Sequence, residues 1–159
     1  MRLKVPVRWA IREGMGIFAW PGTNRVGCPE IDADHQPMLE LLDKLHDAMV
    51  TGRGDVAVME TLNALIAQET RHFACEEKLM QKHGCPGLTE HRLHHRHLLK
   101  ELQALRRRVR AGHMPVAYDT MQTMRQWVRD HINGEDRAAA DHIMGRRADK
   151  HTRGLLMAG

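Results

Sequence analysis

Histidines and carboxylates recur at helical spacing in this chain. His72 and Glu76 are four residues apart, as are His91 and His95. Side chains at i and i+4 project from the same face of an α-helix. Imidazole together with carboxylate suits iron, zinc or manganese. The spacing therefore predicts a metal site, although a lone histidine on such a face is more often a satisfied core residue than a ligand.

These polar residues interrupt stripes that are otherwise apolar and that follow gaps of three and four residues, the period of an α-helix. A buried imidazole or carboxylate is costly unless it is paired or coordinated. Six such residues from four segments therefore indicate coordination rather than ordinary packing. The six are His35, His72, Glu76, His91, His95 and His131.

The stripes predict four helices of about 20 residues each, separated by glycine and proline breakers. Short loops make consecutive helices antiparallel neighbours. We therefore expect an all-α protein, an antiparallel up-down-up-down four-helix bundle. Its parts are a poorly ordered N-terminal extension (1–19), a four-helix domain (20–145) and a basic C-terminal tail (146–159), with a short C-terminal helix after Gly134. Asp32 or Asp34 is expected to cap the first helix, with Pro37 in or next to its first turn.

A seventh ligand is expected from Asp136, five residues after His131. In a regular α-helix these two side chains would diverge by about 140°. A common site therefore requires a local widening, and we predict a π-bulge or another irregularity between residues 131 and 136, near Gly134. Seven ligands are more than one ion would use, and a carboxylate can bridge two ions.

With these ligands in order, the chain resembles the bacterial hemerythrins over roughly residues 20–136. The matching segments are VGCPEIDADH (26–35), HFACEE (72–77), HRLHH (91–95) and WVRDHINGED (127–136).

This resemblance implies a non-haem di-iron centre. His91, His95 and His131 would bind one iron, and His35 and His72 the other. Glu76 and Asp136 would bridge both, together with a solvent-derived oxo or hydroxo group.

The resemblance also implies reversible O2 binding for carriage, storage or sensing, with O2 held as hydroperoxide on the five-coordinate iron. The protein would then not be an enzyme. The alternatives are a di-iron oxidase or peroxidase, or an iron-repair or nitric-oxide-response protein of the hemerythrin-like type. Ferritin-like di-iron enzymes use carboxylate-rich ligand sets, whereas five histidines with two carboxylates favour binding.

An apolar pocket is expected beside the irons. Its candidate residues are Trp20, Met38, Phe73, Trp127, Val128 and Ile132. Glu69, one turn before His72, either orients a ligand imidazole or reaches the solvent edge. Glu77 is expected to face outward. The histidines off the stripes are expected in solvent: His46, His83, His94, His97, His113, His142 and His151.

Composition excludes several other classes. No apolar stretch approaches 18 residues, which argues against a membrane span. The net charge of +4 is modest, and the arginines at 106–108 and 110 have no interleaved aromatic residues, so no nucleic-acid partner is expected. Three cysteines without paired spacing, and no signal peptide, fit a cytoplasmic protein. We expect a monomer or weak homo-oligomer, with an unknown protein partner possible, and residues 1–14 appended to the domain.

Overall fold

The computed structural model describes residue 18 and residues 25–52 and 54–145. Several expectations lie outside these described residues. They are the rest of the extension 1–19, the pocket residue Trp20 and the basic tail 146–159.

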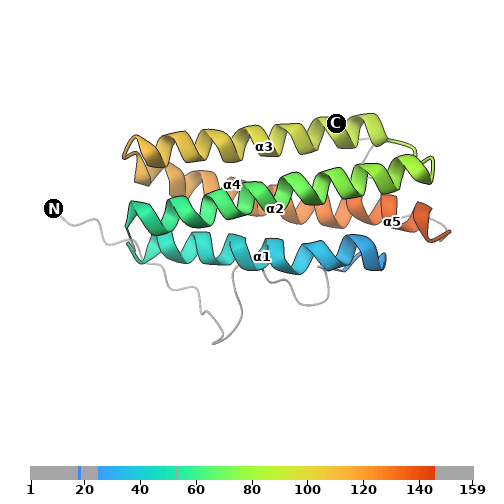
Figure 1. The fold of residues 1–159 in the computed structure, drawn as a ribbon, viewed down its shortest axis with the longest axis horizontal. Helices are drawn as coiled ribbons and strands as arrows, with labels where there is room; N and C mark the ends of the chain where they lie inside the picture. The colour runs from blue at the N-terminus through green and yellow to red at the C-terminus, as the bar shows by residue number, and fades with distance from the viewer. Residues whose placement is uncertain (1–17, 19–24, 53, 146–159) are drawn as a thin grey trace.

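Four long helices run side by side along the molecule (Figure 1). They are α1 (Pro29–Val50), α2 (Asp55–Lys82), α3 (Leu88–Arg110) and α4 (Met114–His131). The last is continued by the π-helix η1 (Ile132–Asp136) and by α5 (Arg137–Ile143). The described residues contain no strand. The predicted all-α four-helix bundle is confirmed.

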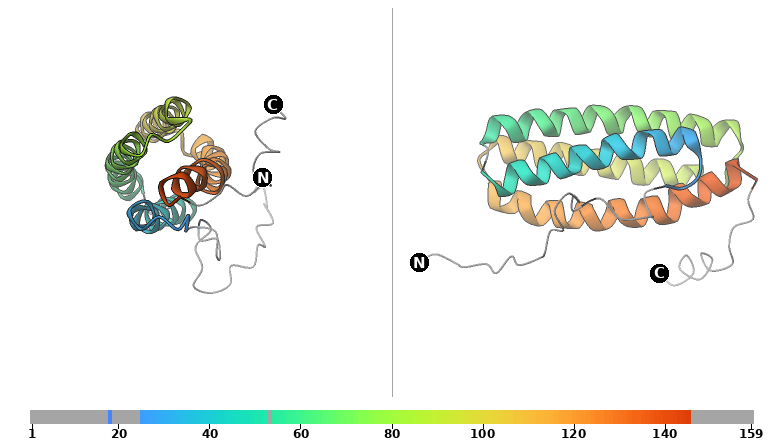
Figure 2. Two further views of the ribbon diagram at one scale, coloured as in Figure 1. Left: turned by 90° about the vertical axis from the view of Figure 1, so that its right-hand side faces the viewer. Right: turned by 90° about the horizontal axis from the view of Figure 1, so that it is seen from below.

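Each long helix packs against two others. Helix α2 lies between α1 and α3, and α4 closes the ring by packing against α3 and α1. The end-on view in Figure 2 shows these rods arranged around a shared interior. None of the helices in the described part is long and apolar enough to cross a bilayer.

The turns between helices depend on glycine where the sequence predicted breakers. Gly87 precedes α3 with φ of 81°, and Gly112 follows it with φ of 79°. Residues with a Cβ atom rarely adopt this left-handed region. The short turns thereby reverse the chain and set consecutive helices antiparallel.

The start of α1 differs from the prediction. The helix begins at Pro29, so neither Asp32 nor Asp34 caps it, and Pro37 lies well inside it. The carboxylate of Asp32 instead accepts hydrogen bonds from the backbone N–H groups of Val26 (2.6 Å) and Gly27 (2.9 Å). Asp32 therefore holds the entering loop against the helix, which is why the helix starts earlier than a capping rule suggests.

The boundary of the folded domain is also corrected. Phe18, expected in the poorly ordered extension, is fully buried in the core. Its backbone N–H donates a hydrogen bond to the Asp43 carboxylate on α1 (2.9 Å). The compact domain therefore includes Phe18, whose apolar ring is part of the core.

The predicted short C-terminal helix is confirmed as α5, and it follows directly on the π-helix. Helices α4 and α5 and the π-helix between them form one continuous rod (Figure 2). Ala139 and Ala140 on α5 are buried, so the rod keeps an inward face beyond the π-helix.

Candidate metal centre

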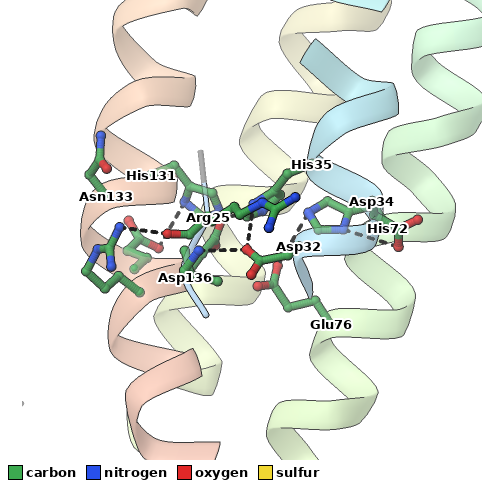
Figure 3. A network of polar contacts seen from close by, with 12 residues as sticks. Arg25, Asp32, Asp34, His35, His72, Glu76, His131, Asn133 and Asp136 are labelled. Atoms are coloured by element: carbon green, nitrogen blue, oxygen red, sulfur yellow. Dashed lines mark hydrogen bonds and ion pairs between the residues drawn. The ribbon is translucent and has the colours of Figure 1, made fainter. Parts of the chain in front are cut away.

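The seven predicted ligands meet in the interior of the bundle. None of them is more than 5% exposed. They form two groups, and within each group the ligand atoms all lie within 4.8 Å of one another. Asp136 belongs to both groups. Glu76, His91, His95, His131 and Asp136 form one group; His35, His72 and Asp136 form the other. Figure 3 shows His35 of α1, His72 and Glu76 of α2, and His131 and Asp136 at the α4–η1 junction gathered around one point.

The larger group is too crowded with acceptors for hydrogen bonding alone. The Nε2 atoms of His95 and His131 are 3.1 Å apart. His131 Nε2 is 3.0 Å from Asp136 Oδ1, and His91 Nε2 is 3.3 Å from Glu76 Oε2. Ligand atoms about 2.1 Å from a shared ion and at right angles lie about 3.0 Å apart. The donor set therefore fits a metal ion at the point where these atoms converge.

Asp136 connects the two groups. Its Oδ1 faces His131 and His91, at 3.0 and 3.4 Å, while its Oδ2 lies 3.2 Å from His35 Nε2. Each oxygen therefore serves one group, the arrangement that a bridge between two ions requires.

Glu76 is placed less symmetrically. Its Oε2 is within 3.4 Å of His91 and His95 and 3.8 Å from His72 Nε2. Its Oε1 is buried and has no hydrogen-bond partner among the described residues. A buried carboxylate oxygen without a partner is costly, so this atom also fits a cation-binding role.

The π-helix explains how Asp136 reaches the site. Residues 132–136 form η1, where the sequence predicted an irregularity, so that prediction is confirmed. The wider turn brings Asp136 back to the face that carries His131, five residues earlier.

A second layer of carboxylates surrounds the imidazoles. All five histidines turn Nε2 inward and Nδ1 toward an acid. The Nδ1 distances are 4.0 Å (His35–Asp32), 3.6 Å (His72–Asp34), 3.7 Å (His91–Glu135), 2.9 Å (His95–Glu77) and 3.4 Å (His131–Glu135). Such partners set the tautomer and orientation of a metal-binding histidine.

Two of these acids correct the sequence analysis. Glu77 was expected to face outward, but its carboxylate lies 2.9 Å from His95. Glu135 was not singled out, although it follows His131 by four residues, the same signal that marked Glu76. His94, expected in solvent, is half-exposed, and its Nδ1 lies 2.6 Å from a carboxylate oxygen of Glu135.

Burial and neighbouring charges shift the pKa values of several groups in the cluster. Burial lowers the pKa of His131, but the charge of Asp136 and the contacts with Asp136 and Glu135 outweigh it and raise that pKa to about 10. Burial raises the pKa of Glu135, but contact with His131 and His94 lowers it to about 2. The same balance with His131 and His35 holds the pKa of Asp136 well below its ordinary range. Burial lowers the pKa of His72.

A small cavity of about 10 Å³ adjoins the cluster. Its lining includes five of the six predicted pocket residues: Met38, Phe73, Trp127, Val128 and Ile132. Two aromatic rings also fix ligand imidazoles. Phe73 stacks on His95 with ring centres 3.8 Å apart, and Trp127 stacks on His131 at 4.6 Å. The cavity therefore offers an apolar space directly beside the cluster.

Glu69 lines the same cavity. It is 1% exposed, and neither carboxyl oxygen has a hydrogen-bond partner among the described residues. Burial, reinforced by Asp136 and Glu76 and opposed by His131 and His35, raises its pKa to about 8. Both predicted roles are wrong, because Glu69 reaches no solvent edge and makes no hydrogen bond to a ligand imidazole.

These features define a helical bundle with an internal site for two metal ions, and comparison with known proteins agrees. Residues 27–143 match the Hemerythrin HHE cation binding domain. The chain belongs to the hemerythrin family, whose domains bind a non-haem di-iron centre.

Several relatives match most of the chain. A Bacteriohemerythrin of Methylococcus capsulatus is 33% identical over 128 residues, covering 77% of this chain and 94% of that protein. A Bacteriohemerythrin of Stenotrophomonas maltophilia is 30% identical, covering 81% and 83%. A crystal structure of wild-type hemerythrin superposes with a TM-score of 0.68 at 29% identity, covering 79% and 96%.

Proposed function

We propose that this protein binds O2 reversibly and that seven side chains hold its di-iron centre. His91, His95 and His131 would hold one iron, His35 and His72 would hold the other, and Glu76 and Asp136 would be shared between them. The two groups of converging ligand atoms, joined by Asp136, are the observation that carries this assignment.

The unequal number of imidazoles supports a binding role. The group of His35 and His72 offers one imidazole fewer than the other, which leaves a coordination position for a small molecule. The cavity lined by His72 and the predicted pocket residues lies beside that position. A pair of ferrous ions supplies the two electrons that reversible O2 binding uses.

The surrounding residues protect such a site. Phe73 and Trp127 exclude water from ligand imidazoles on which they stack. Glu77 lies at hydrogen-bond distance from Nδ1 of His95 and favours the tautomer with its proton there, which leaves Nε2 free for the metal. These contacts favour binding and release over loss of the metal.

Oxygenation of the iron-loaded, reduced protein tests this function. We expect a colourless solution to turn pink or red in air and to bleach when oxygen is removed, with two irons per chain by metal analysis. Colour that is lost irreversibly, with release of hydrogen peroxide, would contradict reversible binding and favour the di-iron oxidase or peroxidase. The acid in the cavity, Glu69, is the observation that favours this second candidate.

Substitution tests the ligand assignment. His91→Ala and Glu76→Ala should each lower the iron content, because each removes a ligand from the larger group. His97→Ala is the matched control, since His97 lies on the same helix as His91 but is exposed. Full iron content in both ligand variants would refute the assignment.

A further inference from the structure

The one carboxyl group in the cavity lining that the proposed ligand set leaves unused belongs to Glu69. It lies on α2, one turn before His72, and is 1% exposed. Both of its oxygens lack a hydrogen-bond partner among the described residues. An unpartnered buried carboxyl is costly, so its position in an otherwise apolar pocket needs an explanation.

Glu69 is not placed as an eighth metal ligand. The two groups of described residues whose ligand atoms lie within 4.8 Å of one another do not include it. Its carboxyl group instead shares the cavity with the ligands His72, His131 and Asp136. A molecule in the cavity would therefore lie between the metal ligands and this acid.

We propose that Glu69 is a carboxylic acid that donates a hydrogen bond to the small molecule bound in this cavity. The pocket would thereby favour molecules of two or three atoms whose outer atom accepts a hydrogen bond. This inference rests on the proposed function, because it places the bound molecule at the di-iron centre.

The surroundings of Glu69 favour a neutral acid. No lysine or arginine lines the cavity, whereas Asp136 does. Burial in this mostly apolar lining favours the neutral form of a carboxyl; Asp136 and Glu76 act in the same direction on the pKa of Glu69, and His131 and His35 oppose them. A protonated carboxyl has one O–H to donate.

The size of the cavity adds a geometric argument. Its volume of about 10 Å³ is close to the least that holds one water molecule. A bound molecule larger than one water would therefore have to displace the lining slightly and would touch it on several sides. The lining holds two side chains outside the proposed ligand set that can donate a hydrogen bond, Glu69 when protonated and the indole of Trp127.

Azide binding to the diferric, iron-loaded protein tests the hydrogen bond. Glu69→Gln keeps a donor of similar shape, whereas Glu69→Leu keeps the volume but removes the donor. We expect the dissociation constant of azide to rise roughly tenfold or more in Glu69→Leu and to stay within about threefold of wild type in Glu69→Gln. Gln68→Leu is the matched control, because Gln68 is buried on the same helix but does not line the cavity.

Infrared spectroscopy gives a second readout that needs no oxygen binding. The wild-type protein should show the carbonyl stretch of a buried protonated acid, absent from Glu69→Gln, and azide should shift this band. If Glu69→Leu fails to hold iron, the Glu69→Gln affinity and the band shift decide the question.

Two results would overturn the proposal. One is unchanged or tighter azide binding in Glu69→Leu, which would mean that Glu69 hinders the ligand or occupies its position. The other is a wild-type spectrum without a Glu69 acid band, or with a band that azide does not move. A protein that passes both azide tests but never binds O2 reversibly would refute the proposed function and leave the role of Glu69 standing.

Discussion

In each imidazole of the cluster, Nδ1 faces outward toward an acid. An acid at Nδ1 favours the tautomer with its proton there, so that Nε2 is available inside. Glu135 is used most heavily, since it lies 3.4 Å from His131, 3.7 Å from His91 and 2.6 Å from His94. From the π-helix, Glu135 therefore contacts two histidines that are proposed as ligands of the same ion.

Glu135→Gln tests this coupling. The amide keeps the shape but loses the charge that orients His131 and His91. We expect iron affinity to fall about 10- to 100-fold, measured by competition with a chelator, while the helical content is unchanged. Glu90→Gln, at an exposed position of α3, is the control. Equal affinity in the two variants would show that Glu135 does not support the ligands.

At this scale the sequence predicted the inward residues better than the outer ones. A helical stripe identifies positions that are buried, which was sufficient for six of the seven candidate ligands; Asp136 lies off the stripe and needed the predicted irregularity. Glu77 and Glu135 are only partly buried, with side chains 24% and 31% exposed. Whether such a carboxylate turns to solvent or to a neighbouring imidazole depends on rotamers and on the adjacent helix, which periodicity does not encode.

Among the elements, the π-helix could be predicted because two candidate ligands stood five residues apart. Gly134, near which the irregularity was expected, is not required there by the backbone. Gly134 does not have a positive φ, and an added Cβ atom would meet nothing within 4 Å. The start of α1 was predicted too late because an aspartate near the beginning of a helix is usually a cap. Asp32 instead accepts hydrogen bonds from the preceding loop, which the sequence pattern does not distinguish from capping.

Gly134→Ala should therefore be tolerated. We expect a gain of roughly 0.5–1 kcal/mol in the free energy of unfolding, because alanine loses less backbone entropy, with iron content unchanged. Gly112→Ala is the matched comparison, since it also has open space but a φ of 79°; it should lose roughly 1–2 kcal/mol. Loss of iron in Gly134→Ala, measured with the denaturation curves, would show that the π-helix requires glycine.

For the whole molecule, the buried charges predict how stability without metal depends on pH. Folded His131, with its pKa raised from 6.5 to about 10, keeps a proton that the unfolded chain releases, so its contribution is lost as pH rises between these values. Glu69, raised from 4.5 to about 8, acts in the same direction. Glu135, lowered from 4.5 to about 2, loses its contribution as pH falls through that range.

The metal-free protein should therefore unfold at its highest temperature near about pH 5 and at lower temperatures toward pH 9. Scanning calorimetry across this range measures the trend, and Glu69→Gln should flatten it between about pH 4.5 and 8. Iron affinity should change in the opposite direction, because ligand histidines must release protons to bind metal. A metal-free unfolding temperature that climbs steadily from pH 5 to 8 would contradict these assignments.

The division of Asp136 between the two groups also bears on how the centre is assembled. An ion that captures Oδ1 beside His131 would fix the direction of Oδ2 beside His35. Binding of the first iron would thus orient a ligand atom for the second. With less iron than sites, most chains would therefore hold either two irons or none. Native mass spectrometry with one iron added per chain would reveal this as a scarcity of singly loaded protein.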